Sequence, residues 1–240
     1  MKTNWHNNIQ FANKTIYWSG SDTYEAWRKH MQDPEIMQYL VKQGWDSATA
    51  ISYKYNSFGF RCPEFTDQPV YIALGCSHTE GVGLPDNQTW PYFLEQLLQH
   101  PVLNLGVGGS SLDTCFRLLD YYIDQINILG VFILEPSPER FEFFMSGFPQ
   151  TFMPGTLNHP SIYKLWAVEE GNAYYTLTKN RNAIKNLCDT VQTKVYSLET
   201  SLFASYRDDK PVEKARDLLH FGVNHQQYIA KKYFELWQSK

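Results

Sequence analysis

Tyr71-Ile72-Ala73-Leu74-Gly75-Cys76-Ser77-His78-Thr79-Glu80-Gly81 is the stretch that decides the fold. Its apolar first half has the character of a strand and stops at Gly75, and a helical pattern opens at residues 90–98. Ser77 is therefore predicted to lie at a strand-to-helix corner, where its hydroxyl projects from the carboxyl end of a sheet. Two interpretations are open for Ser77: a nucleophile, or a serine that caps a helix or completes a turn.

The same order of strand, turn and helix recurs beyond this corner. Short apolar runs predict further strands at residues 102–105, 131–134 and 194–198. Apolar residues at near-helical spacing predict helices at residues 112–126, 177–191 and 224–237. Alternation of this kind is typical of an α/β fold with a parallel sheet.

An acid and a histidine stand three residues apart near the end of the chain, in the run Arg216-Asp217-Leu218-Leu219-His220-Phe221-Gly222. A serine hydroxyl needs a base to take its proton near pH 7, and the base needs an acid to fix its tautomer. Asp217 and His220 can supply both from one short loop. His225 is a competing base, but it falls inside the predicted helix 224–237 and has no acid at the same spacing. We therefore interpret His225 as structural.

Three short blocks of the chain, in this order, resemble those of the SGNH/GDSL family of hydrolases. Residues 75–81 (Gly-Cys-Ser-His-Thr-Glu-Gly) are similar to the family's Gly-Asp-Ser-x-Thr-x-Gly nucleophile block. Residues 104–109 (Asn-Leu-Gly-Val-Gly-Gly) are similar to its oxyanion-glycine block, and residues 217–220 (Asp-Leu-Leu-His) match its terminal Asp-x-x-His block. The resemblance covers roughly residues 69–240.

The resemblance implies a three-layer α/β/α, flavodoxin-like fold and a Ser-His-Asp triad that works without a metal or an organic cofactor. Carried over residue by residue, Ser77 is the nucleophile, His220 is the base, and Asp217 is the acid that orients the base. The backbone N–H groups of Ser77 and Gly109 form the implied oxyanion hole. Asn104, in the second block, is expected to brace loops and not to touch the substrate.

The chain departs from the family pattern at two positions. Cys76 stands where the family has the aspartate of Gly-Asp-Ser, and that position mainly supports the turn, so we expect a tuned loop with the nucleophile retained. The family's oxyanion asparagine follows the third strand, but here the chain reads Glu135-Pro136-Ser137-Pro138-Glu139-Arg140. Ser137 is the candidate replacement donor. Loss of one oxyanion donor typically costs about a hundredfold or more in rate.

Two further features have a local interpretation. Arg140 and Glu139 are expected to form an ion pair on a solvated loop, and the alternative, in which Arg140 lines the cleft and meets an acidic substrate, stays open. The glycines at residues 106–109 do not form a dinucleotide-binding fingerprint, because the third glycine of Gly-x-Gly-x-x-Gly would fall at Ser111.

Composition fits one sizeable globular domain, or a domain with an appended segment. The 240 residues are 43% hydrophobic and 16% aromatic, which is enough to bury a full core. The formal net charge is -4, and no Lys/Arg block or basic stripe is present. The sequence therefore argues against nucleic acid as a partner.

Cysteine usage and the chain start indicate a compartment. The four cysteines are widely spaced, with no Cys-x-x-Cys pair, and are expected to be free thiols in a reducing environment. The first residues lack the apolar core of a signal peptide, and no run approaches the roughly 18 apolar residues of a membrane span. We expect a cytoplasmic protein with no membrane span.

We expect two parts: an extension of residues 1–68 that packs on a hydrolase-like domain of residues 69–240. The extension is rich in Trp and Tyr, and we expect these rings to form an interface with the sheet; a sugar-binding platform is the alternative. Asp33-Pro34-Glu35 predicts a helix start within it. Residues 141–173 lack periodicity and are interpreted as an insertion, which forms a lid or acyl-facing wall or else covers core or a subunit contact.

Together these features predict a serine hydrolase that cleaves carboxylic esters through an acyl-enzyme. O-acetylated glycans and short acyl esters are both in range, so the expected partner is a small molecule or a glycan. Two alternatives stay open: an O-acyltransferase that uses the same triad, and a degenerate member that binds a glycan without cleaving it. The oligomeric state is left open by the sequence.

Overall fold

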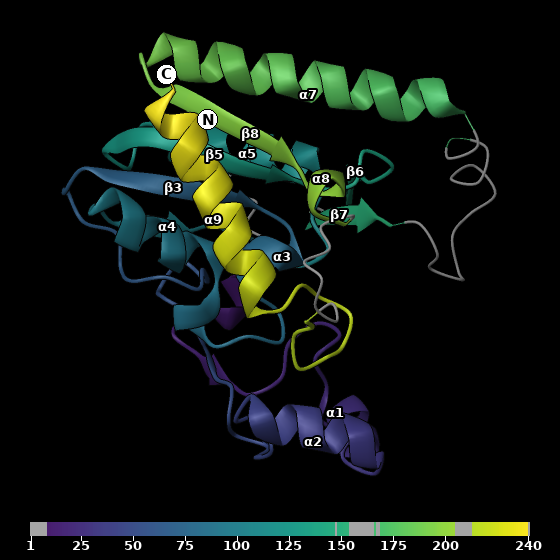
Figure 1. Cartoon of the computed structure of the whole chain (residues 1–240). Helices are drawn as coiled ribbons and strands as arrows, with labels where there is room; N and C mark the ends of the chain where they lie inside the picture. The colour runs from purple at the N-terminus through teal and green to yellow at the C-terminus, as the bar shows by residue number, and fades with distance from the viewer. Residues whose placement is uncertain (1–8, 147, 154–165, 167–168, 205–212, 240) are drawn as a thin grey trace.

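A four-stranded parallel sheet forms the centre of the molecule (Figure 1). The computed structural model describes residues 9–146, 148–153, 166, 169–204 and 213–239. The strands are β3 (Val70–Gly75), β4 (Val102–Asn104), β5 (Ile128–Glu135) and β8 (Lys194–Glu199). Their spatial order is β4-β3-β5-β8, which is 2-1-3-4 along the chain, as in flavodoxin-like sheets.

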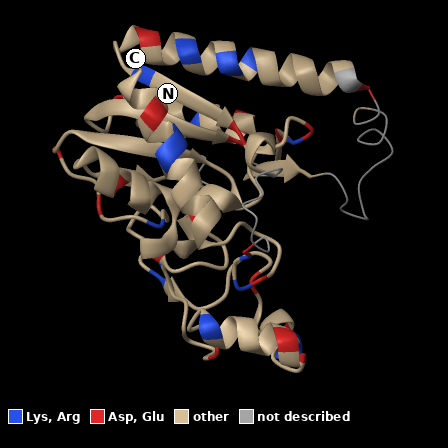
Figure 2. Ribbon diagram, in the orientation of Figure 1, with Lys and Arg blue, Asp and Glu red and all other residues tan. Residues whose placement is uncertain are grey.

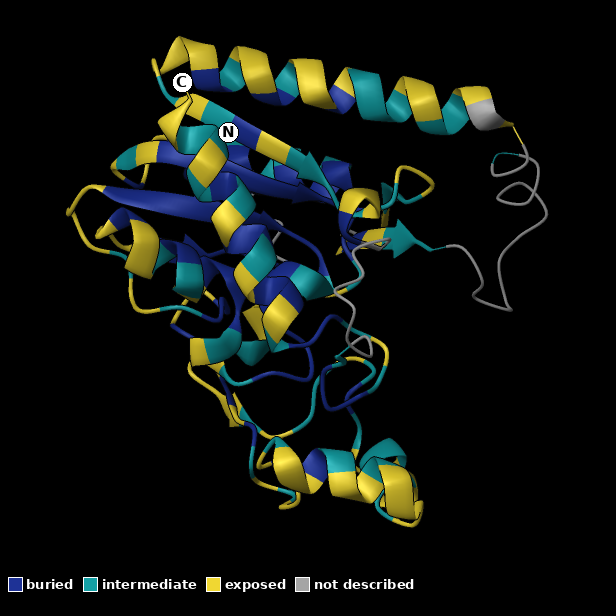
Figure 3. Ribbon diagram, viewed as in Figure 1, coloured by how far each residue is buried: buried dark blue, intermediate teal, exposed yellow. Residues whose placement is uncertain are grey.

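Helices cover both faces of this sheet. Ile72 and Leu74 of β3 join a core with α5 (Leu112–Tyr122) and α7 (Glu170–Thr190). Tyr71 and Ala73 point to the opposite face and join a core with α4 (Trp90–Leu98) and α9 (Val223–Gln238). All of β3 is buried, as its colour in Figure 3 shows, and burial on both faces explains why the strand reads as a continuous apolar run. The predicted three-layer fold is confirmed.

The chain changes direction at β3. The next strand in sequence, β4, lies on one side of β3, and β5 lies on the other. In open α/β sheets, the crevice at such a switch point, outside the carboxyl ends of the strands, is where ligands bind. Ser77 follows β3 and residues 136–140 follow β5, so both segments start at this crevice.

The N-terminal segment folds into short elements. They are η1 (Ile9–Phe11), β1 (Thr15–Ile16), α1 (Tyr24–His30), α2 (Pro34–Lys42) and β2 (Tyr53–Lys54). Strands β1 and β2 pair antiparallel. Helix α2 begins as predicted, because the Asp33 side chain accepts hydrogen bonds from the N–H groups of Glu35 and Ile36.

Aromatic residues of this segment form a third core. Trp45 and Tyr53 pack with other apolar side chains around Leu84 and Ala215, which lie on loops outside the sheet. The expected interface with the sheet is therefore wrong for this group, because helices already occupy both faces. Phe60, further along the chain, does join the core on the α5 face.

Residues 141–152 form an antiparallel hairpin of β6 (Phe141–Met145) and β7 (Phe148–Phe152). Glu142 ties the hairpin to α5 by accepting hydrogen bonds from Thr114 Oγ1 (2.7 Å) and Arg117 Nε (2.6 Å). The sequence pattern predicts no regular structure here, so the hairpin is a feature that the sequence analysis did not predict. Residues 154–165 and 167–168 of the expected insertion lie outside the described residues.

Three short elements complete the described chain: α3 (Ser77–Glu80), η2 (Asp86–Gln88) and α8 (Ser201–Ala204). Basic and acidic positions are interspersed on α7 and α9 (Figure 2). All four cysteines are free, as expected. In the described part of the chain, no helix combines the length and the apolar character needed to cross a bilayer.

Candidate active site

Ser77 lies at the sharp corner between β3 and α3. Gly75, just before it, has a φ of 152°, and a Cβ atom there would lie 2.2 Å from Thr79 Oγ1 and 2.7 Å from the Leu134 carbonyl oxygen. Both distances are shorter than non-bonded atoms tolerate, so the corner requires glycine. Cys76 is buried and its side chain makes no capping hydrogen bond to α3. The corner thus forms without the aspartate of the family block.

The loop that carries Asp217 and His220 is held by its own backbone. Asp217 Oδ1 accepts hydrogen bonds from the N–H groups of Leu219 (3.0 Å) and His220 (3.1 Å). The Arg216 N–H donates to the Gly83 carbonyl oxygen (2.9 Å), which joins this loop to the turn after α3. The two predicted site segments are therefore bound to each other by main-chain contacts.

Ser77, His220 and Asp217 lie in one line of hydrogen bonds. Ser77 Oγ is 2.7 Å from His220 Nε2, and His220 Nδ1 is 2.5 Å from Asp217 Oδ2. The serine and the histidine are 143 residues apart in sequence. The structure thus brings together all three residues of the predicted triad.

The electrostatics of this line keep the acid ionised. Burial alone would raise the pKa of Asp217, but hydrogen bonds from His220 and Ser21 and the charge of His220 outweigh it and lower the pKa to about 2. The ionised carboxylate accepts from Nδ1–H, which leaves Nε2 free to accept the serine proton. This arrangement is what a serine nucleophile needs.

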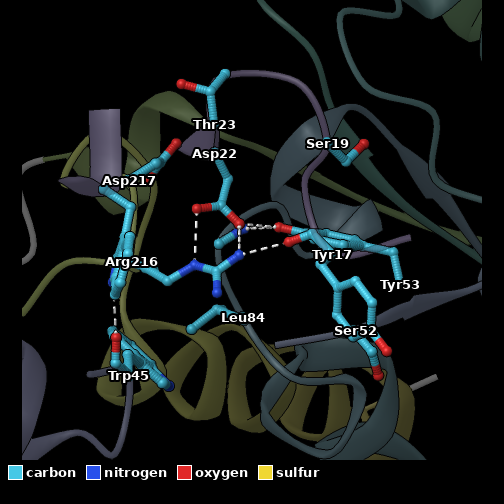
Figure 4. Close-up of polar contacts among 12 residues, drawn as sticks. Tyr17, Ser19, Asp22, Thr23, Trp45, Ser52, Tyr53, Leu84, Arg216 and Asp217 are labelled. Atoms are coloured by element: carbon cyan, nitrogen blue, oxygen red, sulfur yellow. Dashed lines mark hydrogen bonds and ion pairs between the residues drawn. The ribbon is translucent and has the colours of Figure 1, made fainter. Parts of the chain in front are cut away.

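The N-terminal segment supports the acid from the other side. Ser21 Oγ donates to Asp217 Oδ2 (2.6 Å). Next to this contact, Arg216 Nε and Nη2 donate to Asp22 Oδ1 (2.9 Å) and Oδ2 (2.6 Å), and both residues are fully buried (Figure 4). Tyr53 Oη also donates to Asp22 Oδ2 (2.6 Å). Two consecutive residues of the segment therefore bind two consecutive residues of the loop, an arrangement we call the double contact.

Two other histidines pack on Phe221, the residue after His220. The His78 ring is 4.8 Å from the His220 ring and stacks on Phe221 at 4.2 Å. Burial, followed by the charge of His220, lowers the pKa of His78 to about 3, so it stays neutral near pH 7. His225 is buried in α9 and also stacks on Phe221, at 5.1 Å. This packing agrees with a structural role for His225, which stays a prediction.

A cavity of about 760 Å³ opens beside the triad. Ser77 and His220 line it, together with the turn at residues 19–21, the turn at residues 107–109, and side chains of the β6–β7 hairpin. This volume is in the range of small-molecule sites. Within the described residues, no group of three or more His, Cys, Asp or Glu side chains is placed to hold a metal ion.

Gly109 lies at the wall of this cavity in a left-handed conformation, with a φ of 73°. No described residue accepts a hydrogen bond from its N–H group. Ser110 Oγ donates to the Gly75 carbonyl oxygen (3.0 Å), which joins this turn to the serine corner. Asn104 braces the same region, as expected: its side chain donates to the Thr79 carbonyl oxygen (2.7 Å) and accepts from a glycine N–H.

Glu80 is a buried acid in the cavity wall that the sequence interpretation missed. Tyr55 Oη donates to its Oε1 (2.7 Å), and the Gly108 backbone also hydrogen-bonds to it. Burial raises the pKa of Glu80, which favours its uncharged form. The signal available in the sequence was its place in the nucleophile block, three residues after the serine.

Arg140, and not Ser137, reaches the cavity from the loop after β5. Ser137 is not among the lining residues, and its carbonyl oxygen accepts from the Arg140 N–H (3.1 Å). The geometry therefore gives no support to Ser137 as an oxyanion donor. Arg140 lines the cavity and has no ion-pair partner among the described residues, so the expected pair with Glu139 is wrong.

Comparison with known proteins finds a likeness among solved structures only. No model of a protein family matches the chain, and no curated protein matches it. The chain is similar to a member of the lipolytic protein G-D-S-L family from Veillonella parvula DSM 2008, at 13% identity and a TM-score of 0.40, covering 72% of this chain and 100% of that one.

Two further solved structures are similar to the chain. One is the psychrotrophic esterase EstA from Pseudoalteromonas sp., at 16% identity and a TM-score of 0.39, covering 72% of this chain and 100% of that one. The other is a carbohydrate acetylesterase family member from Sinorhizobium meliloti, at 11% identity and a TM-score of 0.34, covering 71% and 98%.

Proposed function

We propose that the chain is a serine hydrolase that cleaves carboxylic esters through a Ser77-His220-Asp217 triad. The observation that carries this proposal is the line of hydrogen bonds from Ser77 Oγ through the imidazole to Asp217, at the edge of a cavity of small-molecule size. A partly exposed serine at a sharp corner, a histidine within hydrogen-bond reach of it and an ionised acid are the parts that nucleophilic catalysis requires.

In the first half of the reaction, Ser77 Oγ attacks the ester carbonyl carbon while His220 Nε2 takes the hydroxyl proton. Asp217 stabilises the imidazolium that forms. The backbone N–H groups of Ser77 and Gly109 donate to the oxygen that becomes negatively charged. The bond to the leaving alcohol then breaks, His220 returns the proton to that alcohol, and an acyl-enzyme on Ser77 remains.

In the second half, a water molecule attacks the acyl-enzyme. His220 removes a proton from the water, the carboxylic acid leaves, and the proton returns to Ser77 Oγ. The substrate is a short acyl ester or an O-acetylated glycan. Both fit the size of the cavity, whose lining combines polar groups with the apolar side chains of Phe148 and Met153.

The same site supports an O-acyltransferase if a sugar hydroxyl replaces water in the second half. Product analysis with and without a sugar acceptor separates the two activities: hydrolysis yields free acid in both cases, whereas transfer yields an acylated sugar only with the acceptor. The assembled triad favours either enzyme over a member that binds a glycan without cleaving it.

The proposal is tested with Ser77→Ala and 4-nitrophenyl acetate. We expect turnover to fall to the level of the solution background and labelling by a fluorophosphonate probe to disappear, with an unchanged circular dichroism spectrum. Ser47→Ala, on an exposed loop, is the matched control and keeps both properties. Undiminished turnover or labelling in Ser77→Ala would remove Ser77 as the nucleophile.

A further inference from the structure

Arg140 carries a positive charge that has no ion-pair partner among the described residues. Its Nε atom is buried and has no hydrogen-bond partner. Among the described residues, its side chain makes one long hydrogen bond of 3.4 Å, from Nη1 to the Ser110 carbonyl oxygen. A guanidinium has five N–H donors in a planar fork, so most of its donor capacity is left for a ligand.

Other arginines are different. Each of four arginines in the described chain lies against a carboxylate; the pairs are Arg61–Asp86, Arg117–Glu142, Arg181–Glu135 and Arg216–Asp22. Arg181 is exposed, but the other three guanidinium groups are buried or partly buried, and each is paired with an acid. Arg140 is the exception, and it lies on the wall of the cavity that holds Ser77 and His220.

No acidic side chain of the described residues forms an ion pair with Arg140 across the cavity. Glu80 is the only acidic residue among the described lining residues, and its carboxyl oxygen accepts a hydrogen bond from Tyr55. Asp217 lies behind His220 and does not line the cavity. A half-buried charge without a partner costs free energy, and an anionic ligand removes that cost.

We propose that Arg140 binds an anionic group of the ester substrate, a carboxylate, phosphate or sulfate, and so selects charged esters over neutral ones. This inference rests on the proposed ester hydrolysis and names its substrate class. Arginine matches such groups with two parallel N–H···O bonds. The backbone of Arg140 is fixed for this role by its N–H bond to Ser137 at one end of the loop and by β6 at the other.

The test compares matched esters that differ in one charge. For charge on the acyl side, the pair is mono-4-nitrophenyl adipate and 4-nitrophenyl hexanoate. For charge on the alcohol side, the pair is 4-acetoxybenzoate and its methyl ester. A charge-assisted hydrogen bond of the usual strength corresponds to about tenfold to a hundredfold in affinity. In at least one pair, we expect Arg140→Gln to lower kcat/KM for the anionic ester about tenfold to a hundredfold more than for the neutral ester. We expect this loss to come from a higher KM and not from a lower kcat.

Arg28→Gln is the control, because it removes the same charge from the exposed surface of α1 and leaves both ratios as in the wild type. Arg140→Lys keeps the charge but loses the fork, and its effect on the anionic ester lies between wild type and Arg140→Gln. An equal fall in kcat for neutral and anionic esters would show instead that Arg140 serves the oxyanion. Equal kinetics in wild type and Arg140→Gln would also overturn the proposal.

A binding measurement separates this inference from the proposed function. By calorimetry, Ser77→Ala is expected to bind the preferred anionic ester about tenfold to a hundredfold more tightly than its neutral partner, and Ser77→Ala combined with Arg140→Gln is expected to lose that preference. If Ser77→Ala shows no preference for the anionic ester while Ser77-dependent hydrolysis is intact, the role of Arg140 alone is refuted. Retained preference without any Ser77-dependent hydrolysis refutes the proposed chemistry and keeps the anion site.

Discussion

Asp217 is held from two sides, and the two sides use different means. Its own loop holds it with backbone N–H groups of the residues two and three positions further on, and with the His220 ring. The N-terminal segment holds it across 196 positions of sequence, through the Ser21 hydroxyl and the adjacent Asp22–Arg216 ion pair.

The two sets of contacts around Asp217 are expected to have different roles: one in the proposed chemistry, the other in the position of the loop. In the proposed mechanism the local contacts act on the carboxylate that orients the base, so they would determine whether a proton can move. The distant contacts determine where the loop stands, and one of them is a buried ion pair whose two charges depend on each other. The Asp-x-x-His block contains only the local half, which is the set of contacts within the loop of Asp217; the distant half is the set of contacts from the N-terminal segment. The following changes break one half at a time.

Asp217→Asn breaks the local half and has the largest expected effect. The amide favours the wrong imidazole tautomer, and in Ser-His-Asp triads this change lowers kcat by about 10⁴. Steady-state hydrolysis of 4-nitrophenyl acetate measures it. Asp67→Asn, on the exposed surface, is the control and keeps wild-type kcat. A loss of less than about tenfold would mean that Asp217 does not orient the base.

Asp22→Ala breaks the distant half. It leaves the Arg216 guanidinium buried without its carboxylate, and removal of one partner of a buried pair typically costs about 3–5 kcal/mol of unfolding free energy. Urea titration followed by tryptophan fluorescence measures the change, with Asp46→Ala at an exposed position as control. Asp22→Asn keeps the shape and is used if Asp22→Ala does not fold. A cost below about 1 kcal/mol in both variants would show that the pair is not a support.

The unfolding free energy at low pH tests the contacts that Asp217 makes within its own loop. The pKa of Asp217 is about 2, below the ordinary aspartate value, so its ionised form stabilises the native state. This contribution, about 2 kcal/mol, is fully present above about pH 4 and is lost as the pH falls through about 2. We expect the advantage of wild type over Asp217→Asn in unfolding free energy to be constant near neutrality and to shrink in this window. An advantage that persists at about pH 2 contradicts the assignment.

Ser21→Ala has the smallest expected effect. We expect Ser21 to act as a positioning residue, since its hydroxyl donates to Asp217, although it also lies in the cavity wall. Loss of one hydrogen bond to a charged group costs about 1.5–3 kcal/mol, and part of this appears as a fall in kcat of about tenfold. KM is expected to change little. A change confined to KM, or to stability, would show that the hydroxyl does not act through Asp217.

The sheet and the triad are the parts of the molecule that the sequence predicts well. Strands such as β3 are buried on both faces, so they read as uninterrupted apolar runs. Ser77, Asp217 and His220 each occupy a short block in which local backbone geometry is part of the signal: a glycine that cannot be replaced, and an acid that caps the N–H groups of its own loop.

The supports of the triad and the substrate wall are the parts that it does not predict. Ser21 and Asp22 act at a distance of nearly the whole chain, and no local pattern connects them to residues 216–217. From the sequence alone, Arg140 is predicted to pair with Glu139 on the surface. The structure instead places it in a cavity wall together with residues of the β6–β7 hairpin.

Because of the double contact, we expect catalytic turnover to depend on the docking of the segment that carries Ser21, Asp22, α1 and α2. Helix α1 has no buried residue, and α2 buries only Leu40, so these two helices bury little of their own surface. We expect ester hydrolysis to fade at a lower urea concentration than the far-ultraviolet signal of the sheet. Coincident midpoints would mean that both ends of the chain melt as one cooperative unit.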